Sequence, residues 1–109
     1  MSSLWDTSQS KIMTLGDICN FSTNFENADF WLQRKGSETS VGKPTKDYYE
    51  ENIGVQVKEE FRDKVDSNYL YYYFTFLHQK GVFGPISHGS LKLKNIRLSD
   101  IKSIPIQFN

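Results

Sequence analysis

Residues 66–81 limit the fold most strongly, because they indicate one helix with a signal at each end. Asp66 or Ser67 can cap the N-terminus through a side-chain oxygen, and Gly81 stands where a left-handed residue follows the last turn. Apolar side chains recur at spacings of three and four residues, which places them on one face: Leu70, Tyr73, Phe74 and Leu77. The sequence therefore predicts a main helix over about residues 67–80, with that face in the core.

The same helix has three further aromatic residues off that face, namely Tyr71, Tyr72 and Phe76. An aromatic platform for single-stranded bases would expose such rings to solvent. A second packed layer, such as a sheet edge or a partner, would cover them instead. The helical spacing favours packing, with Tyr71 or Tyr72 as the ring nearest to solvent.

Short segments around this helix have the patterns of strands and turns. Residues 52–58 alternate apolar with small or polar side chains, as a half-buried strand does. Residues 30–35 begin with β-forming aromatics and end at a Gly36-Ser37 turn. Residues 88–90 indicate a turn that leads into the strictly alternating residues 91–94. These segments predict a small sheet.

Two helical turns and a loop complete the predicted order. Thr14, with Asp17 three residues later, can cap a turn over residues 14–18. Ser99 can cap another over residues 99–104, which Pro105 stops, and residues 81–85 indicate a turn-rich strand or loop. We therefore expect an α+β fold with a small mixed or antiparallel sheet, one main helix and short helical turns.

The length of 109 residues and the lack of a long linker predict one domain over residues 11–109, preceded by a flexible N-terminal arm over residues 1–10. Cys19 is the single cysteine, so no disulfide can form within the chain, and the N-terminus lacks a signal-peptide pattern. These features predict a cytoplasmic protein. No apolar run approaches the roughly 20 residues that span a bilayer, so we expect no membrane partner.

Patterns for catalysis and metal binding fail on their spacing. Residues 36–43 have five residues between two glycines where a phosphate loop has four, and Pro44 replaces its Ser or Thr. His78, His88 and Cys19 lack the paired spacing of a zinc site. The acidic residues at 50–51 and 59–60 are adjacent pairs that point to different faces. We therefore expect no enzyme activity, no catalytic residues, no metal and no cofactor.

Charge is balanced in sum and polarised along the chain. Thirteen basic and thirteen acidic residues give a net charge of zero, which is unlike a generic polyanion binder. Residues 1–67 hold eight Lys/Arg against twelve Asp/Glu, whereas residues 68–109 hold five against one. A local basic island lies at residues 34–46 within the acidic half. Two separate segments are therefore candidates for phosphate contacts.

The order of these segments resembles a known family. The resemblance rests on LGDI at residues 15–18, FWLQRKGS at 30–37 with VGK at 41–43, IGVQV at 53–57, YLYYYF at 69–74, SHGS at 87–90 and LSDIKSIPI at 98–106. Between about Lys11 and Phe108 the chain is similar to the target-recognition domain of type I restriction-modification DNA specificity subunits. It would be a shortened, stand-alone version, because the sequence stops where that family continues into a long spacer helix.

The resemblance implies a non-catalytic α+β reader of double-stranded DNA, whose strands and loops approach the major groove. In that family, methyltransferase and translocase subunits supply the chemistry. Arg34 has the donor geometry for a bidentate contact to guanine, and Gln33 or Gln79 has the donor and acceptor geometry for adenine. The DNA-binding residues predicted on this basis are Gln33, Arg34, Lys35, Ser37, Lys43, Lys46, Lys80, His88, Ser90, Lys92, Lys94 and Arg97.

Two functions remain open on the sequence. One is DNA binding by a phage or other mobile-element protein that occupies a site or competes for one. The other is a protein-interaction module that binds a restriction, defence or replication complex without reading DNA, which the twelve acids in residues 1–67 favour. A homodimer would predict a palindromic DNA site, but no residue in the sequence marks its interface.

Overall fold

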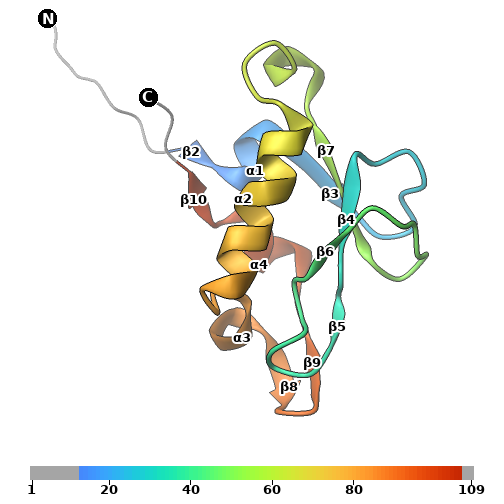
Figure 1. The fold of residues 1–109 in the computed structure, drawn as a ribbon, viewed down its shortest axis with the longest axis vertical. Helices are drawn as coiled ribbons and strands as arrows, with labels where there is room; N and C mark the ends of the chain where they lie inside the picture. The colour runs from blue at the N-terminus through green and yellow to red at the C-terminus, as the bar shows by residue number, and fades with distance from the viewer. Residues whose placement is uncertain (1–12, 107–109) are drawn as a thin grey trace, which may run out of the picture.

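The computed structural model describes residues 13–106, which form three antiparallel sheets and several helices (Figure 1). The predicted arm over residues 1–10 lies outside the described residues. The elements are β2 Met13–Thr14, α1 Leu15–Ile18, β3 Cys19–Ser22, β4 Phe30–Leu32, β5 Lys35–Gly36, β6 Pro44–Thr45, β7 Ile53–Val57, η1 Glu59–Phe61, α2 Ser67–Gln79, α3 Phe83–Ile86, β8 His88–Ser90, β9 Leu93–Asn95, α4 Leu98–Lys102 and β10 Pro105–Ile106. The α+β class expected from the sequence is confirmed.

A four-stranded sheet in the order β3-β7-β4-β6 forms the centre of the core. Val55 of β7 pairs with Phe21 on one side and with Phe30 on the other. The predicted strand over residues 52–58 is confirmed as β7, although it is buried on both faces rather than one. The reason lies at Gly54, where an added Cβ would collide with Phe25 and Ala28.

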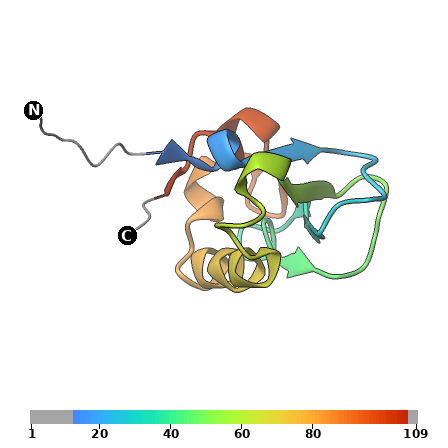
Figure 2. The same cartoon turned by 90° about the horizontal axis from the view of Figure 1, so that it is seen from above.

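The predicted main helix is confirmed as α2, which begins and ends where its signals lie. Asp66 accepts a hydrogen bond from the Asn68 amide at 2.9 Å, and Gly81 has a φ of +73° after the last turn. The buried residues of α2 are Leu70, Phe74 and Leu77. Each such buried side chain contributes about 1.5–3 kcal/mol to stability. Figure 2 shows α2 on one side of the molecule and α4 on the other.

The second sheet is smaller and has the order β5-β9-β8. Its first strand follows β4 directly, so residues 30–36 enter one sheet and then the other (Figure 1). The sequence predicts one strand over residues 30–35, and the structure divides it at Gln33-Arg34. β10 and β2 form a third, two-stranded sheet that brings the two ends of the described chain together.

Three local expectations are wrong. Residues 83–86 form the short helix α3 rather than a strand or loop, because Phe83 is buried against Phe74 and the Ser87 hydroxyl donates to the Gly84 carbonyl at 2.6 Å. Residues 88–90 are strand β8 rather than a turn, and the turn lies instead at residues 91–92.

The third concerns the last helix, which begins at Leu98 with Arg97 as its cap. Ser99 therefore lies in the first turn. Ile101 of this helix is fully buried in the core. The turn over residues 14–18 is confirmed as α1, with the Thr14 amide donating to the Asp17 carboxylate at 2.8 Å. No helix within residues 13–106 is long and apolar enough to cross a membrane.

Candidate nucleic-acid interface

The β5-β9-β8 sheet joins the two basic segments of the sequence. Lys35 pairs with Asn95, and Gly36 pairs with Lys94. Lys92 lies in the turn between β8 and β9. Figure 1 shows this hairpin at the lower end of the molecule. Lysines from residues 34–46 and from residues 80–97 therefore stand on neighbouring strands, although they are far apart in sequence.

The pairing also distributes these lysines between the two faces of the sheet. Lys35, Asn95 and His88 lie directly opposite one another across the three strands and so share a face. Lys94 belongs to the other face, between Gly36 and Gly89. Because glycines flank it on both sides, no side chain on the neighbouring strands covers its stem. Lys92 at the turn can serve either face.

His88 is held by a partner within the protein. Its Nε2 lies 2.9 Å from the Asp100 carboxylate on α4, and the Asn95 amide group donates to the His88 carbonyl at 3.3 Å. The ring therefore fixes the sheet to α4 and is not simply free for a phosphate. Ser90, at the end of β8, is exposed and pairs with Leu93.

The loop over residues 37–43 is built around the Ser40 hydroxyl. It accepts from the Ser37 amide at 2.8 Å and from the Gln33 side chain at 3.3 Å. Gln33 Nε2 also donates to the Lys35 carbonyl at 2.8 Å. The Glu38 amide donates to the carbonyl of Leu91 at 2.9 Å, so the loop supports the tip of the hairpin. Gln33 and Ser37 thus shape this loop, and their polar groups already have protein partners.

Arg34, Lys43 and Arg97 surround this sheet and loop. Arg34 lines a pocket of about 510 Å³ together with Glu50 and Glu51, so acidic groups share its surroundings. Lys43 is exposed and lines a second pocket of about 450 Å³. Arg97 is exposed at the N-terminus of α4.

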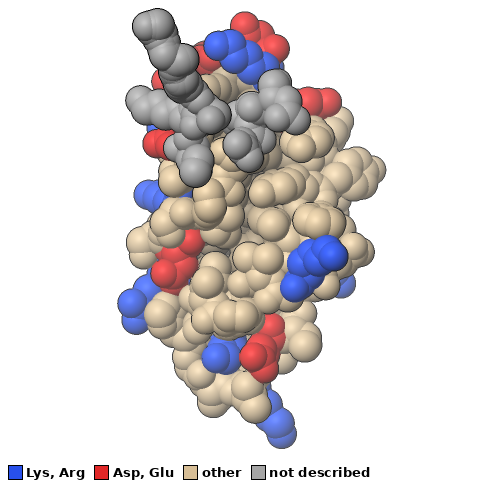
Figure 3. All heavy atoms as spheres, turned by 90° about the vertical axis from the view of Figure 1, so that its left-hand side faces the viewer, with Lys and Arg blue, Asp and Glu red and all other residues tan. Residues whose placement is uncertain are grey.

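Lys46, directly after β6, and Lys80, directly after α2, lie near the two ends of α2 rather than on the β5-β9-β8 sheet. Lys46 Nζ is 3.3 Å from the Asn68 side-chain oxygen and 4.5 Å from the centre of the Tyr71 ring, near the start of the helix. Lys80 lies at its end, with Nζ 5.5 Å from the centre of the Phe76 ring. Figure 3 shows basic and acidic side chains interspersed with uncharged ones on the face that it presents, without a continuous basic area.

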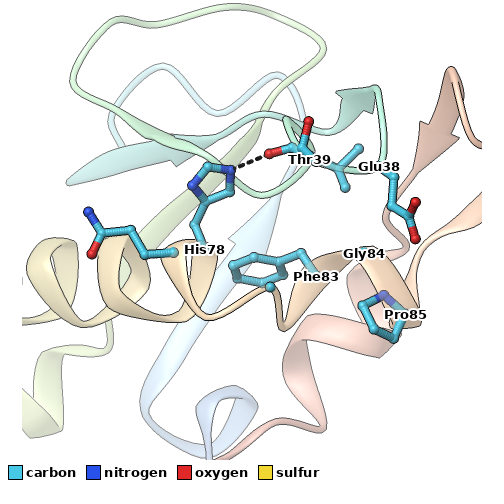
Figure 4. A pocket seen from close by; sticks show the side chains of 9 residues that line it. Glu38, Thr39, His78, Phe83, Gly84 and Pro85 are labelled. Atoms are coloured by element: carbon cyan, nitrogen blue, oxygen red, sulfur yellow. Dashed lines mark hydrogen bonds between the residues drawn. The ribbon is translucent and has the colours of Figure 1, made fainter.

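A pocket of about 520 Å³ lies between the loop and the end of α2 (Figure 4). His78 Nε2 is 2.8 Å from the Thr39 carbonyl, which can only accept, so Nε2 carries a proton. His78 thus ties the loop to the helix. Phe83 forms an apolar wall and Glu38 lines the opposite side. No group of three His, Cys, Asp or Glu side chains within residues 13–106 is placed to hold a metal ion.

Sequence reasoning missed Asn95 and Asp100, which position the centre of the sheet and His88. It also missed the exposure of Leu91 and Leu93, whose side chains are 66% and 77% accessible. The alternation at residues 91–94 is the signal for a strand, but alternation alone does not say which face is buried.

The arrangement of helices and sheets is similar in fold to part of a solved S subunit. The crystal structure of a type I restriction-modification system S subunit from M. genitalium matches this chain with a TM-score of 0.66 and 14% sequence identity. The match covers 92% of this chain and 34% of that chain, so the chain spans about a third of the subunit's length. No family model and no curated protein matches the sequence.

Proposed function

We propose that this chain is a non-catalytic domain that binds double-stranded DNA through the β5-β9-β8 sheet and the loop over residues 37–43. The observation that carries the proposal is the pairing of Lys35 and Gly36 with Asn95 and Lys94, which joins both basic segments in one small sheet. The β8-β9 hairpin within this sheet is a two-stranded ribbon, an element that the major groove admits. The similarity to a type I S subunit in fold is a second support.

The binding residues proposed at this surface divide by role. Lys35, Lys43, Lys92, Lys94 and Arg97 would contact phosphates, which position a protein without specifying sequence. Arg34 and Ser90 would face bases or sugars at its edges. Gln33, Ser37 and His88 would support the loop and the sheet, and Lys46 and Lys80 would add only long-range attraction. The domain would act by occupying its site or competing for one, as a protein of a phage or other mobile element can.

Charge reversal on matched exposed lysines tests this surface. The double variant Lys35→Glu with Lys92→Glu changes the sheet, and Lys64→Glu with Lys102→Glu changes charge equally elsewhere; all four side chains are exposed. Fluorescence anisotropy with a labelled random-sequence duplex measures affinity. With the five phosphate contacts proposed above, affinity of the natural sequence should fall about 500-fold between about 50 and about 200 mM salt.

We expect the sheet variant to bind at least about tenfold more weakly at the lower salt, because two phosphate contacts are lost, and the control variant to change far less. Circular dichroism and thermal unfolding verify that both variants are folded. Equal losses in the two variants would overturn the choice of surface. Absence of DNA binding by the natural sequence at low salt would overturn the function itself.

A second candidate is a protein-interaction module that binds a restriction, defence or replication complex. Exposed rings on α2 favour it, since Tyr69, Tyr72 and Phe76 are 58%, 70% and 50% accessible. Under this candidate, the acidic residues in the first half of the chain would form the charged surface that the protein partner contacts, in place of DNA. Affinity for duplex DNA would then be negligible even in low salt.

A further inference from the structure

The outer face of α2 has no charged side chain along its whole length. Residues 67–79 contain no Asp, Glu, Lys or Arg. A surface helix ordinarily carries charged residues opposite its buried stripe. Here the buried residues Leu70, Phe74 and Leu77 are opposed by rings rather than by charges.

Three of these rings form a stripe that the rest of residues 13–106 leaves at least half accessible. Tyr69, Tyr72 and Phe76 follow one another at spacings of three and four residues, so they share a face of the helix. At roughly 200 Å² for each aromatic side chain, their accessible fractions expose roughly 350 Å² together. That is nearly half of the roughly 800 Å² that each partner contributes to a standard protein interface.

Contacts within the chain already hold the side chains of the stripe in place. The Tyr69 and Tyr73 rings stack with centres 6.4 Å apart and planes inclined by 10°. The Lys80 ammonium lies 5.5 Å from the centre of the Phe76 ring. Side chains that are already held lose less conformational entropy on binding, which favours association.

The charges at the two ends of α2 specify how a second copy would fit. Asp66 caps the N-terminus and Lys80 the C-terminus, and both are exposed. Tyr72 lies midway between Tyr69 and Phe76 on the stripe, close to the middle of the helix. A twofold axis beside Tyr72 would place Tyr69 against Phe76 of the other copy, and Lys80 against Asp66 of the other copy.

We propose that two copies of this chain associate through this α2 stripe as an antiparallel, twofold-symmetric helix pair. The antiparallel direction places opposite charges together at both ends and opposes the two helix dipoles. The net charge of zero adds no overall repulsion between copies. A twofold pair uses the same patch on both subunits, which a charge-free stripe with complementary ends satisfies. The proposal is independent of DNA binding.

Sedimentation velocity over a wide range of protein concentration tests the association. The natural sequence should pass from monomer to dimer, and Tyr72→Glu should weaken dimerisation by at least about tenfold because it buries a charge without a partner. Tyr49→Glu is the matched control, since Tyr49 is 57% accessible and lies outside α2. It should leave the dimer unchanged. A chain that stays monomeric throughout, or equal effects of both variants, would overturn the proposal.

Charge exchange at the ends tests the direction of the helices. Lys80→Glu places two carboxylates together in the antiparallel pair and should weaken the dimer. Adding Asp66→Asn, which keeps a capping side chain, removes that repulsion and should restore part of the loss. Asp66→Asn alone separates the two directions, because it removes an attraction to Lys80 in the antiparallel pair and a repulsion between two Asp66 carboxylates in a parallel pair. A stronger dimer in this single variant would contradict the proposed geometry.

Cross-linking gives a readout that does not depend on affinity. With Tyr72→Cys, a short bis-maleimide should link two copies, because residue 72 lies beside its own symmetry mate. Cys19 is buried and should not react in the folded protein. Tyr49→Cys should give no linked dimer, and linkage at position 49 but not at 72 would overturn the assignment of this face.

Discussion

His88 and Asp100 join the β8-β9 hairpin to α4 through a 2.9 Å contact between Nε2 and the carboxylate. The two side chains are 40% and 29% accessible, so water screens part of their attraction. The contact therefore contributes orientation more than stability, because it fixes the strand that pairs with the lysine-bearing strand β9.

A double-mutant cycle on this pair should give a coupling energy of about 0.5 kcal/mol. The variants are His88→Ala, Asp100→Asn and the two combined, and urea unfolding at pH 6 to 7 gives the free energies. If the pair orients the sheet, each single variant should also lower DNA affinity by a similar factor, with no further loss in the double variant. Fully additive effects on both quantities would contradict the role assigned to the contact.

Gly42 and Gly81 share a left-handed backbone and differ in the space around them. Their φ angles are +84° and +73°, but an added Cβ would strike the Phe83 ring at Gly42 and meet no atom at Gly81. Gly81→Ala should therefore lower the free energy of unfolding by about 1–2 kcal/mol from backbone strain alone. Gly42→Ala should cost about 1–3 kcal/mol more from overpacking. Chemical denaturation measures both, and equal losses would show that Phe83 moves aside without cost.

Phe74 and Phe76 lie two residues apart on α2 and face opposite ways. Phe74 is fully buried, with its ring centre 5.7 Å from that of Phe30 and 6.2 Å from that of Phe83. Phe74→Ala should lower the free energy of unfolding by about 3–5 kcal/mol. Phe76→Ala should change it by no more than about 0.5 kcal/mol in protein dilute enough to be monomeric. A large loss from Phe76→Ala in dilute protein would show that its ring belongs to the core.

The buried Cys19 thiol predicts that the free energy of unfolding falls in alkaline solution. Its burial, with a smaller contribution from the Asp29 charge, raises the thiol pKa from 9.0 to about 12. Below pH 9 the thiol is neutral in the folded and unfolded states, so it leaves stability unchanged. Between pH 9 and about 12 only the unfolded thiol ionises, which favours unfolding by up to about 1.4 kcal/mol for each pH unit.

The measurement compares urea unfolding of the natural sequence and Cys19→Ala from pH 7 to pH 10.5. The natural sequence should lose stability above pH 9 more steeply than the variant. Reaction with a thiol-specific reagent at neutral pH should require unfolding, because only 2% of Cys19 is accessible. If the free energy of unfolding of the two proteins changed with pH in the same way, ionisation of the thiol would not be the cause of the loss.

The elements that could be predicted from the sequence are those whose structure depends on neighbouring residues. α2 follows its cap at Asp66, its apolar spacing and its glycine at position 81, all of which act within a few residues. The capped turn before Cys19 was found for the same reason. β7 was found from its alternation, but its burial on both faces depends on Phe25 and Ala28, which come from a distant loop.

The candidate site depends on contacts that local patterns do not contain. No spacing near Lys35 indicates that Asn95 is its partner, or that Lys46 turns toward Tyr71. The alternation at residues 91–94 predicted a strand without saying which face is buried, and Leu93 is 77% accessible in β9. Composition could identify the basic segments but not the strands that join them.

The passage of residues 30–36 through two sheets sets an order of assembly. Gly36 can pair with Lys94 only after the chain between them has closed a long loop. Closing that loop lowers the entropy of the chain, and the few contacts of the small sheet offset this cost poorly. We therefore expect the four-stranded sheet and α2 to form first and the β5-β9-β8 sheet to attach last. Its amide hydrogens should accordingly exchange with solvent through local openings, well before those of β7. If so, the β5-β9-β8 sheet would open in the folded protein at a lower free energy than the four-stranded sheet.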